Sequence, residues 1–263
     1  IISLFPAEKE SFLPLLSLLF FPDSQPKSDY INTIDFLYSY TSPIISIIQS
    51  LITESNSSIF SSIATVYAEI IQYLMPNDIS ASNKKLDPEE KKSYETLQNF
   101  CLFNLKKDQG INRVIGSLCL TKLVENCPFV LKSQYMKLIF DTIIDCINNK
   151  EFNAKYELLN CLISLILGAE SLFCPYANVT LYKVLDFLSD NDWIKRKLAL
   201  NVIYTLIFYC KQEILPLQEQ IINFLNVLKK DNVKEIRDIR VLILKIFDDK
   251  KSNNSNNNSA SFR

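Results

Sequence analysis

Apolar residues recur every three or four positions along most of the chain, the spacing of helices that bury one face. Turn-forming residues interrupt this pattern and divide it into twelve expected helices, which we group as six pairs. Their ranges are Ala7–Phe21, Tyr30–Tyr40, Ile44–Ile52, Ile59–Leu74, Pro88–Lys106, Gly110–Asn126, Leu131–Asn148, Ala154–Leu167, Asn178–Leu188, Asp192–Cys210, Leu215–Leu228 and Asn232–Asp248. The pattern predicts an all-α protein.

The helix pattern repeats at a fixed spacing. Lys155, Arg196 and Arg237 lie 41 residues apart, and Arg113 lies 42 residues before Lys155. A short polar residue suited to a turn or a helix start stands six residues before Lys155, Arg196 and Arg237, and an apolar residue stands ten residues after each of them. A period of about 40 to 47 residues built from helix pairs is typical of HEAT and armadillo arrays. We therefore expect an α-solenoid of about six HEAT-type helix pairs.

The regularity of the repeats suggests how the chain is divided. Residues 1–75 read as degenerate N-terminal repeats, and residues 88–250 read as regular ones. Between them, residues 76–87 are polar and lack an apolar period, so they are expected to form an inter-repeat loop. We expect residues 1–250 to form one continuous solenoid, because stacked repeats share one core. The Asn- and Ser-rich residues 251–263 have little apolar surface to bury and are expected to be disordered.

The turn between the helices of a pair carries a polar pattern. An Asp or Asn there can accept a hydrogen bond from the basic residue six positions later, in its own repeat or in the adjacent one. The expected pairs are Asp190 with Arg196, Asp231 with Arg237, and Asn149 with Lys155. Asp108 stands near Arg113 in the same way. Such bonds predict a polar ladder that stabilises the stack, with each basic residue contributing about 1.5 to 3 kcal/mol.

Trp193 is the only tryptophan in the chain, and it lies in one of these turns. The equivalent positions in the neighbouring turns are Phe152 and Lys234, and Lys195 and Lys197 flank the Trp193 turn. An aromatic residue with a basic rim is typical of a protein-binding anchor. The alternative is that the indole packs under a neighbouring repeat.

Composition narrows the range of functions. The net charge is −1 and the pI about 5.7, which does not favour nucleic-acid binding. The chain has no His and only three Gly, so a His-based catalytic site, a zinc site and a phosphate-binding loop are not expected. We predict a non-catalytic protein without a cofactor or metal. The seven Cys lie mostly in apolar helical runs and are expected to be reduced core thiols in the cytosol.

The longest apolar runs, from Phe12 to Phe21 and from Leu198 to Cys210, are too short to cross a bilayer. Pro14 and Asn201 also interrupt them. Membrane insertion is therefore not expected.

Three segments in order resemble a known family. They are Asn153 to Leu165, Ser189 to Ala199 with its D-W-x-x-R-K core, and Asn232 to Asp238. Together they resemble the C-terminal half of the TOG-like HEAT domain of the tortifolia and spiral families, which are plant-type microtubule-associated proteins. The resemblance extends over roughly 100 residues, from 153 to 251. Glu235 stands where that family commonly has Pro.

The resemblance implies a cytoplasmic module that binds tubulin or microtubules through its intra-repeat turns. It places Trp193, Lys195, Arg196 and Lys197 on the tubulin-facing edge. The predicted edge also includes Phe152, Lys234 and Arg113. Other cytoskeletal proteins are a further class of expected partner. Two alternatives remain open: a general HEAT scaffold that binds a protein through the face formed by its second helices, and an architectural part of a larger cytoskeletal assembly.

Overall fold

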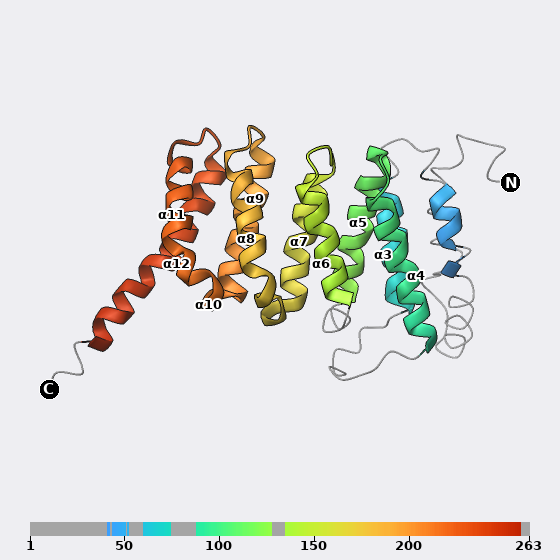
Figure 1. The fold of residues 1–263 in the computed structure, drawn as a ribbon, viewed down its shortest axis with the longest axis horizontal. Coiled ribbons are helices and arrows are strands. Elements are labelled where there is room, and N and C mark those ends of the chain that lie inside the picture. The colour runs from blue at the N-terminus through green and yellow to red at the C-terminus, as the bar shows by residue number, and fades with distance from the viewer. Residues whose placement is uncertain are drawn as a thin grey trace, which may run out of the picture. The chain divides into compact units, whose positions relative to one another are not determined.

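The computed structural model describes residues 41–42, 44–50, 52, 60–74, 88–127 and 135–258. Every regular element among these residues is helical, which confirms the all-α prediction for this part of the chain (Figure 1). The expected helices Ala7–Phe21 and Tyr30–Tyr40 and the expected loop at 76–87 lie outside the described residues.

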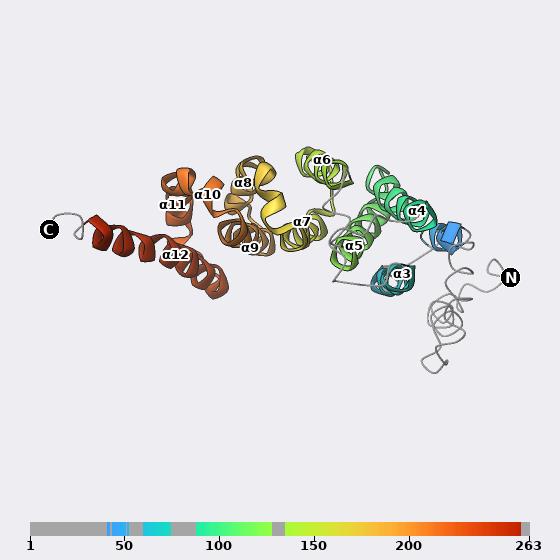
Figure 2. The same cartoon turned by 90° about the horizontal axis from the view of Figure 1, so that it is seen from below.

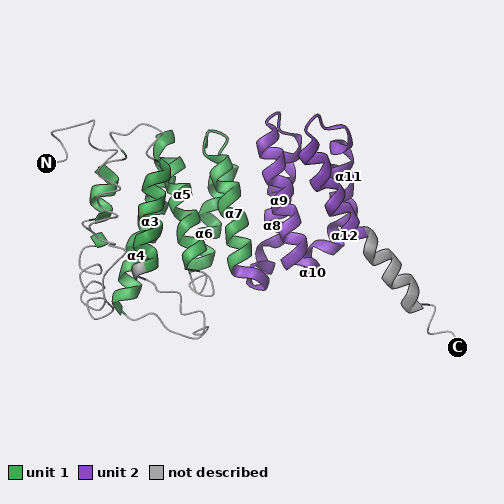
Figure 3. Ribbon diagram, turned by 180° about the vertical axis from the view of Figure 1, so that it is seen from behind, with its two compact units in different colours: residues 1–168 green, residues 169–263 purple. Residues whose placement is uncertain are grey.

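The chain divides into two compact units, Ile1–Gly168 and Ala169–Arg263 (Figure 3). The main helices that begin in the first unit are α3 (Phe60–Leu74), α4 (Pro88–Leu105), α5 (Gly110–Asn126), α6 (Tyr135–Asn148) and α7 (Lys155–Ala169). Those of the second are α8 (Ala177–Leu185), α9 (Trp193–Tyr209), the short α10 (Lys211–Ile214), α11 (Gln218–Val227) and α12 (Lys234–Asn258). The continuous solenoid expected over residues 1–250 stays a prediction.

Short 3-10 helices join or extend several α-helices of the second unit. They are η5 (Glu170–Tyr176), η6 (Asp186–Ser189), η7 (Leu215–Leu217) and η8 (Leu228–Lys230). Because η6 and η8 each tighten the end of a helix, the chain turns directly into the next helix, α9 or α12. The turns therefore span only residues 190–192 and 231–233.

The helix ends differ from the predicted ends by a few residues in most cases, and α12 shows the largest difference. This helix extends to Asn258, and the disorder expected for residues 251–263 stays a prediction. The stretch from Lys234 to Asn258 contains no Gly or Pro, the residues that most strongly oppose helix propagation.

In the first unit, α5 packs against both α3 and α4. Tyr67 on α3 is fully buried, and its hydroxyl donates a hydrogen bond of 2.8 Å to the carbonyl oxygen of Leu97 on α4. Gly116 lets α5 approach the backbone of α4. A Cβ atom at Gly116 would lie 2.9 Å from the nitrogen of Leu105 and 3.0 Å from the carbonyl oxygen of Cys101.

In the second unit, α8 and α11 form one layer and α9 and α12 form the other (Figure 2). Helix α9 packs against α8, α10, α12, η5 and η6. Its buried residues accordingly form a broad face: Leu198, Ala199, Leu200, Val202, Ile203, Thr205, Leu206 and Ile207. Contacts with so many neighbours leave a narrow surface strip on this helix.

The helical stretch Lys155–Ser189 is long and apolar enough, by length and composition, to cross a membrane. Its apolar side chains are largely inside the protein, however, and Leu158, Leu162 and Leu165 are fully buried. The stretch also contains a backbone break at Glu170, where φ is 50°. We interpret it as a pair of core helices joined by η5.

All seven cysteines are free thiols in this structure, and six of them are buried, as expected for core residues. Burial raises the pKa of Cys161 to about 12. Burial, together with the nearby Asp145 carboxylate, raises the pKa of Cys146 to about 11, although Arg113 and Lys106 oppose the shift. These thiols are protonated at neutral pH and are poor nucleophiles.

The close approach of α4 and α5 can be tested with Gly116→Ala. Its added methyl group would collide with backbone atoms, so we expect the free energy of unfolding to fall by about 1 to 3 kcal/mol despite the better helix propensity of alanine. Gly110→Ala is the control, because its Cβ would meet the side chain of Asn153, which can rotate away. Equal urea denaturation midpoints for the two variants would contradict the packing argument.

Candidate functional site

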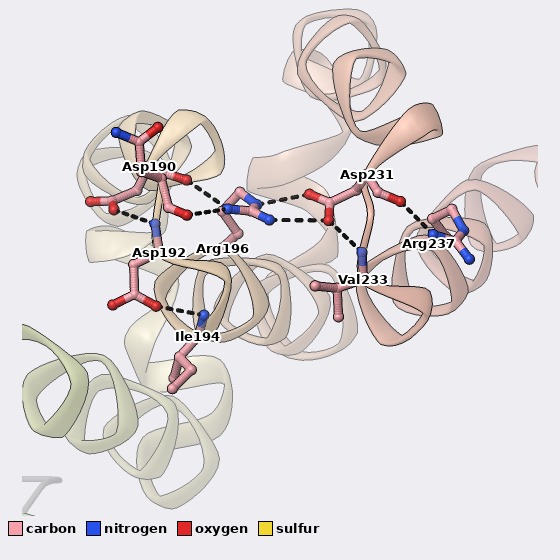
Figure 4. A network of polar contacts seen from close by, with 8 residues as sticks. Asp190, Asp192, Ile194, Arg196, Asp231, Val233 and Arg237 are labelled. Carbon is pink, nitrogen blue, oxygen red and sulfur yellow. Dashed lines mark hydrogen bonds and ion pairs between the residues drawn. The ribbon is translucent and has the colours of Figure 1, made fainter.

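The turn before α9 is built by two aspartates (Figure 4). Oδ1 of Asp190 accepts a hydrogen bond of 2.9 Å from the backbone N–H of Asp192, which fixes the turn. Asp192 is the N-cap residue of α9, and its Oδ1 accepts a bond of 2.9 Å from the N–H of Ile194. Trp193 therefore stands at the first position of the helix, at the rim of the turn.

The turn before α12 has the same construction. Oδ1 of Asp231 accepts a hydrogen bond of 2.9 Å from the N–H of Val233, and α12 begins at Lys234. Asp190 and Asp231 both have extended backbones, with ψ values of 143° and 139°. The two turns thus repeat each other locally, 41 residues apart in the sequence.

Arg196 joins these two turns (Figure 4). Its Nε and Nη2 donate to the two carboxylate oxygens of Asp231, at 2.8 and 3.0 Å. Its Nη1 donates to the backbone carbonyls of Asp190 and Asn191, at 2.8 and 3.0 Å. The side chains of Arg196 and Asp231 are only 14% and 6% exposed. This is a bidentate ion pair shielded from solvent, and bidentate Arg–carboxylate pairs are among the strongest side-chain hydrogen bonds.

The hydrogen bonds between the turns of the second unit differ in detail from the predicted pairs. Arg196 reaches the carboxylate of the adjacent turn, whereas its own turn supplies only backbone carbonyls. Arg237 likewise donates to the backbone carbonyl of Asp231. The bonds between Arg196 and Asp231 hold the start of α12 to α9. The apolar residues of the two helices pack against each other farther along the helices.

The first unit uses the same device with different acceptors. Arg113 donates to the carbonyl oxygens of Lys107 at 2.7 Å and Glu151 at 2.9 Å, and its Nη2 lies 3.2 Å from Oδ1 of Asp108. Asn149 accepts a bond of 2.9 Å from the N–H of Glu151 and so shapes its own turn. The bond expected between Asn149 and Lys155 stays a prediction.

Two residues expected at the binding edge are inside the protein instead. Arg113 and Phe152 are 7% and 3% exposed, and the guanidinium of Arg113 lies 5.2 Å from the centre of the Phe152 ring. Phe152 is buried because it lies against Arg113, whose donors are already used by the turns. Their assignment to a partner-binding surface is wrong, and both residues stabilise the first unit. Arg196 is likewise occupied by the ladder.

Trp193 lies at the surface of the second unit, with 40% of the residue exposed. Lys197 Nζ lies 5.8 Å from the centre of its ring, within range of a cation–π interaction. Lys197 also forms an ion pair with Glu235 at the start of α12. Lys195 is held 3.2 Å from Oδ2 of Asp190. The two lysines that flank the indole are thus positioned by carboxylates.

Lys234 is exposed at the first position of α12, as expected for an edge residue. The sequence prediction missed Lys229 and Lys230, which are both exposed at the end of η8 and lead into the Asp231 turn. Their position could have identified them, because basic residues are favoured in the last turn of a helix, where their charge complements the helix dipole. We define the turn edge of the second unit as Trp193, Lys195, Lys197, Lys229, Lys230 and Lys234.

A comparison with protein families identifies the chain. The family model described as TORTIFOLIA1 N-terminal matches residues 32–249. The chain belongs to this family. No curated protein matches the sequence. The matched range contains both turns and the whole of the turn edge, which confirms the family resemblance drawn from the Asp190 and Asn232 segments.

The turn edge of this tortifolia-family chain offers an indole and several ammonium groups. Among the described residues, no group of three or more Asp, Glu or Cys side chains is arranged to hold a metal ion. The chemistry that the edge supports is recognition of a partner that carries carboxylates and an apolar contact for the indole.

The charge state of Asp231 follows from its contacts. Burial raises the pKa of this carboxyl, but the hydrogen bonds from Arg196 and Val233, with the charges of Arg196 and Arg237, outweigh that effect. The pKa of Asp231 is therefore below its usual value. The carboxylate remains ionised, and the ion pair intact, at any pH near neutrality.

Removal of the ladder arginine should destabilise this tortifolia-family chain. We expect Arg196→Ala to lower the free energy of unfolding by about 1.5 to 3 kcal/mol, because Asp231 would remain shielded without its charged donor. Lys195→Ala is the matched control and should cost about 0 to 1 kcal/mol, because its ion pair is closer to solvent. Urea denaturation followed by circular dichroism measures both. An equal loss in the two variants would contradict the assignment.

The lowered pKa of Asp231 makes this stabilisation depend on pH. The stabilisation is fully present above the unfolded-state pKa of about 3.9 and is lost as the pH falls through the lower folded-state value. The difference in unfolding free energy between wild type and Asp231→Asn should therefore be constant from pH 7 to pH 5. It should shrink below about pH 4. A difference that stays constant to the lowest pH would show that the charge of Asp231 is not what stabilises the turn.

Proposed function

We propose that this chain is a non-catalytic HEAT-type array that binds tubulin or microtubules through the turn edge of its second unit. It would act in the cytoplasm, as an attachment or regulatory module of the microtubule cytoskeleton. The observation that carries the proposal is the exposed Trp193 at the rim of a rigid turn, in a chain of the TORTIFOLIA1 N-terminal family.

The repeated turns support the HEAT-type architecture. Each of the pairs α8 with α9 and α11 with α12 ends its first helix in a 3-10 turn, passes through an Asp-containing turn and starts a second helix. Arg196 then bonds to the next turn along. A contact that each pair makes with its neighbour is the property expected of a stacked repeat.

The geometry of Trp193 supports a role in binding rather than in packing. Core residues of α9 such as Ile203 and Leu206 are fully buried, but the indole remains 40% exposed. The fixed turn restricts the backbone at Trp193, so little conformational entropy would be lost when a partner covers the ring. Tryptophan in such a position is the residue type most often found at the energetic centre of an interface.

The charges around Trp193 support an acidic partner. Lys229, Lys230 and Lys234 are exposed around the Asp231 turn, although the whole chain has a net charge of −1. Local excess of one sign attracts the opposite sign over about a Debye length, roughly 8 Å at physiological salt. Glu235 limits this excess because it neutralises Lys197. Binding should therefore be moderate in strength and sensitive to ionic strength.

Two single variants test the proposal by co-sedimentation with microtubules and by size-exclusion chromatography with tubulin. Trp193→Ala should weaken binding about tenfold, as expected for loss of an aromatic anchor. Lys234→Glu should weaken it most at low salt, because it reverses an exposed charge.

The control variants are Tyr182→Ala, which removes an exposed aromatic side chain from α8, and Lys245→Glu, which reverses an exposed charge farther along α12. Both should bind like wild type. If Trp193→Ala and Lys234→Glu fold normally and also bind like wild type, the turn edge is not the tubulin-binding surface.

A further inference from the structure

A strip of exposed and half-buried side chains runs along α9 from the turn edge. Trp193, Lys197, Asn201, Tyr204 and Phe208 follow one another at spacings of four, four, three and four residues, so they share one helical face. Tyr204 and Phe208 are 40% and 67% exposed. We call these five residues the α9 strip. An aromatic surface of this kind on a helix otherwise surrounded by neighbours indicates a contact site.

The strip has nearly the same character when it is read in either direction. An aromatic residue stands at each end, with Trp193 eight residues before Asn201 and Phe208 seven residues after it. Lys197 lies four residues before Asn201 and Tyr204 three residues after it. A one-residue mismatch is only about 1.5 Å along the helix axis. A surface with this symmetry is complementary to itself.

We propose that a second copy of this chain docks on the α9 strip, with the two α9 helices antiparallel about a two-fold axis at Asn201. In this arrangement Trp193 contacts Phe208 of the second copy. Lys197 lies over the ring of Tyr204 of the second copy, and the two Asn201 amides meet at the axis. Each contact occurs twice, as an isologous interface requires.

The polarity of α9 favours the same arrangement. Antiparallel copies align the two helix dipoles in opposite directions, and a net charge of −1 produces little repulsion between copies.

Helix α12 widens the apolar surface beside the strip. Lys197 pairs with Glu235, which sets the register between α9 and α12. Seven residues farther along each helix stand Tyr204 on α9 and Leu242 on α12, and Leu242 is 51% exposed. The contact surface is therefore broader than one helix, and it contains the aromatic and aliphatic residues that are enriched at the cores of interfaces.

This inference does not rest on tubulin binding, although both surfaces include Trp193. Self-association would cover the indole and so compete with a partner at the turn edge. Phe208 belongs to the α9 strip alone and separates the two proposals. Phe208→Ser should impair self-association and leave tubulin binding unchanged.

The first experiment measures molar mass over a series of protein concentrations, by size-exclusion chromatography with light scattering and by sedimentation velocity. We expect a concentration-dependent dimer for wild type and a dimer Kd raised at least about tenfold for Phe208→Ser. Phe103→Ser is the matched control, because Phe103 is an equally large side chain, 56% exposed on α4, and this variant should dimerise like wild type. A monomeric wild type at every concentration, or a Phe208→Ser variant with wild-type Kd, would overturn the proposal.

A second experiment tests the position of the axis. Asn201→Cys places two thiols next to each other in the proposed dimer, so a short bis-maleimide should join the two chains in high yield. Val227→Cys, at a highly exposed position on α11, is the control and should give only the low yield of the wild-type thiols. Equal cross-linking of the two variants would exclude this axis, whichever oligomer the first experiment finds.

Discussion

The ion pair between Arg196 and Asp231 is the contact on which the arrangement of the second unit depends. It uses both oxygens of one carboxylate and two nitrogens of one guanidinium, and the third nitrogen donates to the carbonyls of the preceding turn. Two helix starts that are 41 residues apart are thereby fixed to each other. Apolar packing between α9 and α12 can then add stability without having to define the register, because packing alone tolerates sliding more readily than a bidentate bond does.

The same contact determines how the surface is presented. Trp193 and Lys234 are the first residues of the two helices that Arg196 and Asp231 join, so their separation is set by buried chemistry rather than by flexible side chains. A partner meets an indole and an ammonium group already held in place, which lowers the entropic cost of association. The residues that stabilise the edge and those that face solvent alternate within a few positions of the chain.

Because stabilising and solvent-facing residues alternate so closely, the sequence could predict some features of the site and not others. The Asp190 and Asp231 turns were identified correctly because a small polar residue before a helix start is a local signal. Arg196 was expected to bond to a turn, but its carboxylate acceptor lies in the next turn and depends on the stacking of two pairs. Phe152 was misassigned because repeat position alone does not show that Arg113 covers the ring.

The two ends of the helix pairs are under different constraints. The turns at 190–192 and 231–233 have the same length and bonding, whereas the connections at the other end differ: η5 alone joins α7 to α8, and α10 with η7 joins α9 to α11. The spacing from Arg113 to Lys155 is also 42 residues rather than 41. In evolutionary terms, insertions and deletions in this family should accumulate at the connections such as η5 and α10, because a change of length there leaves every guanidinium opposite its acceptor.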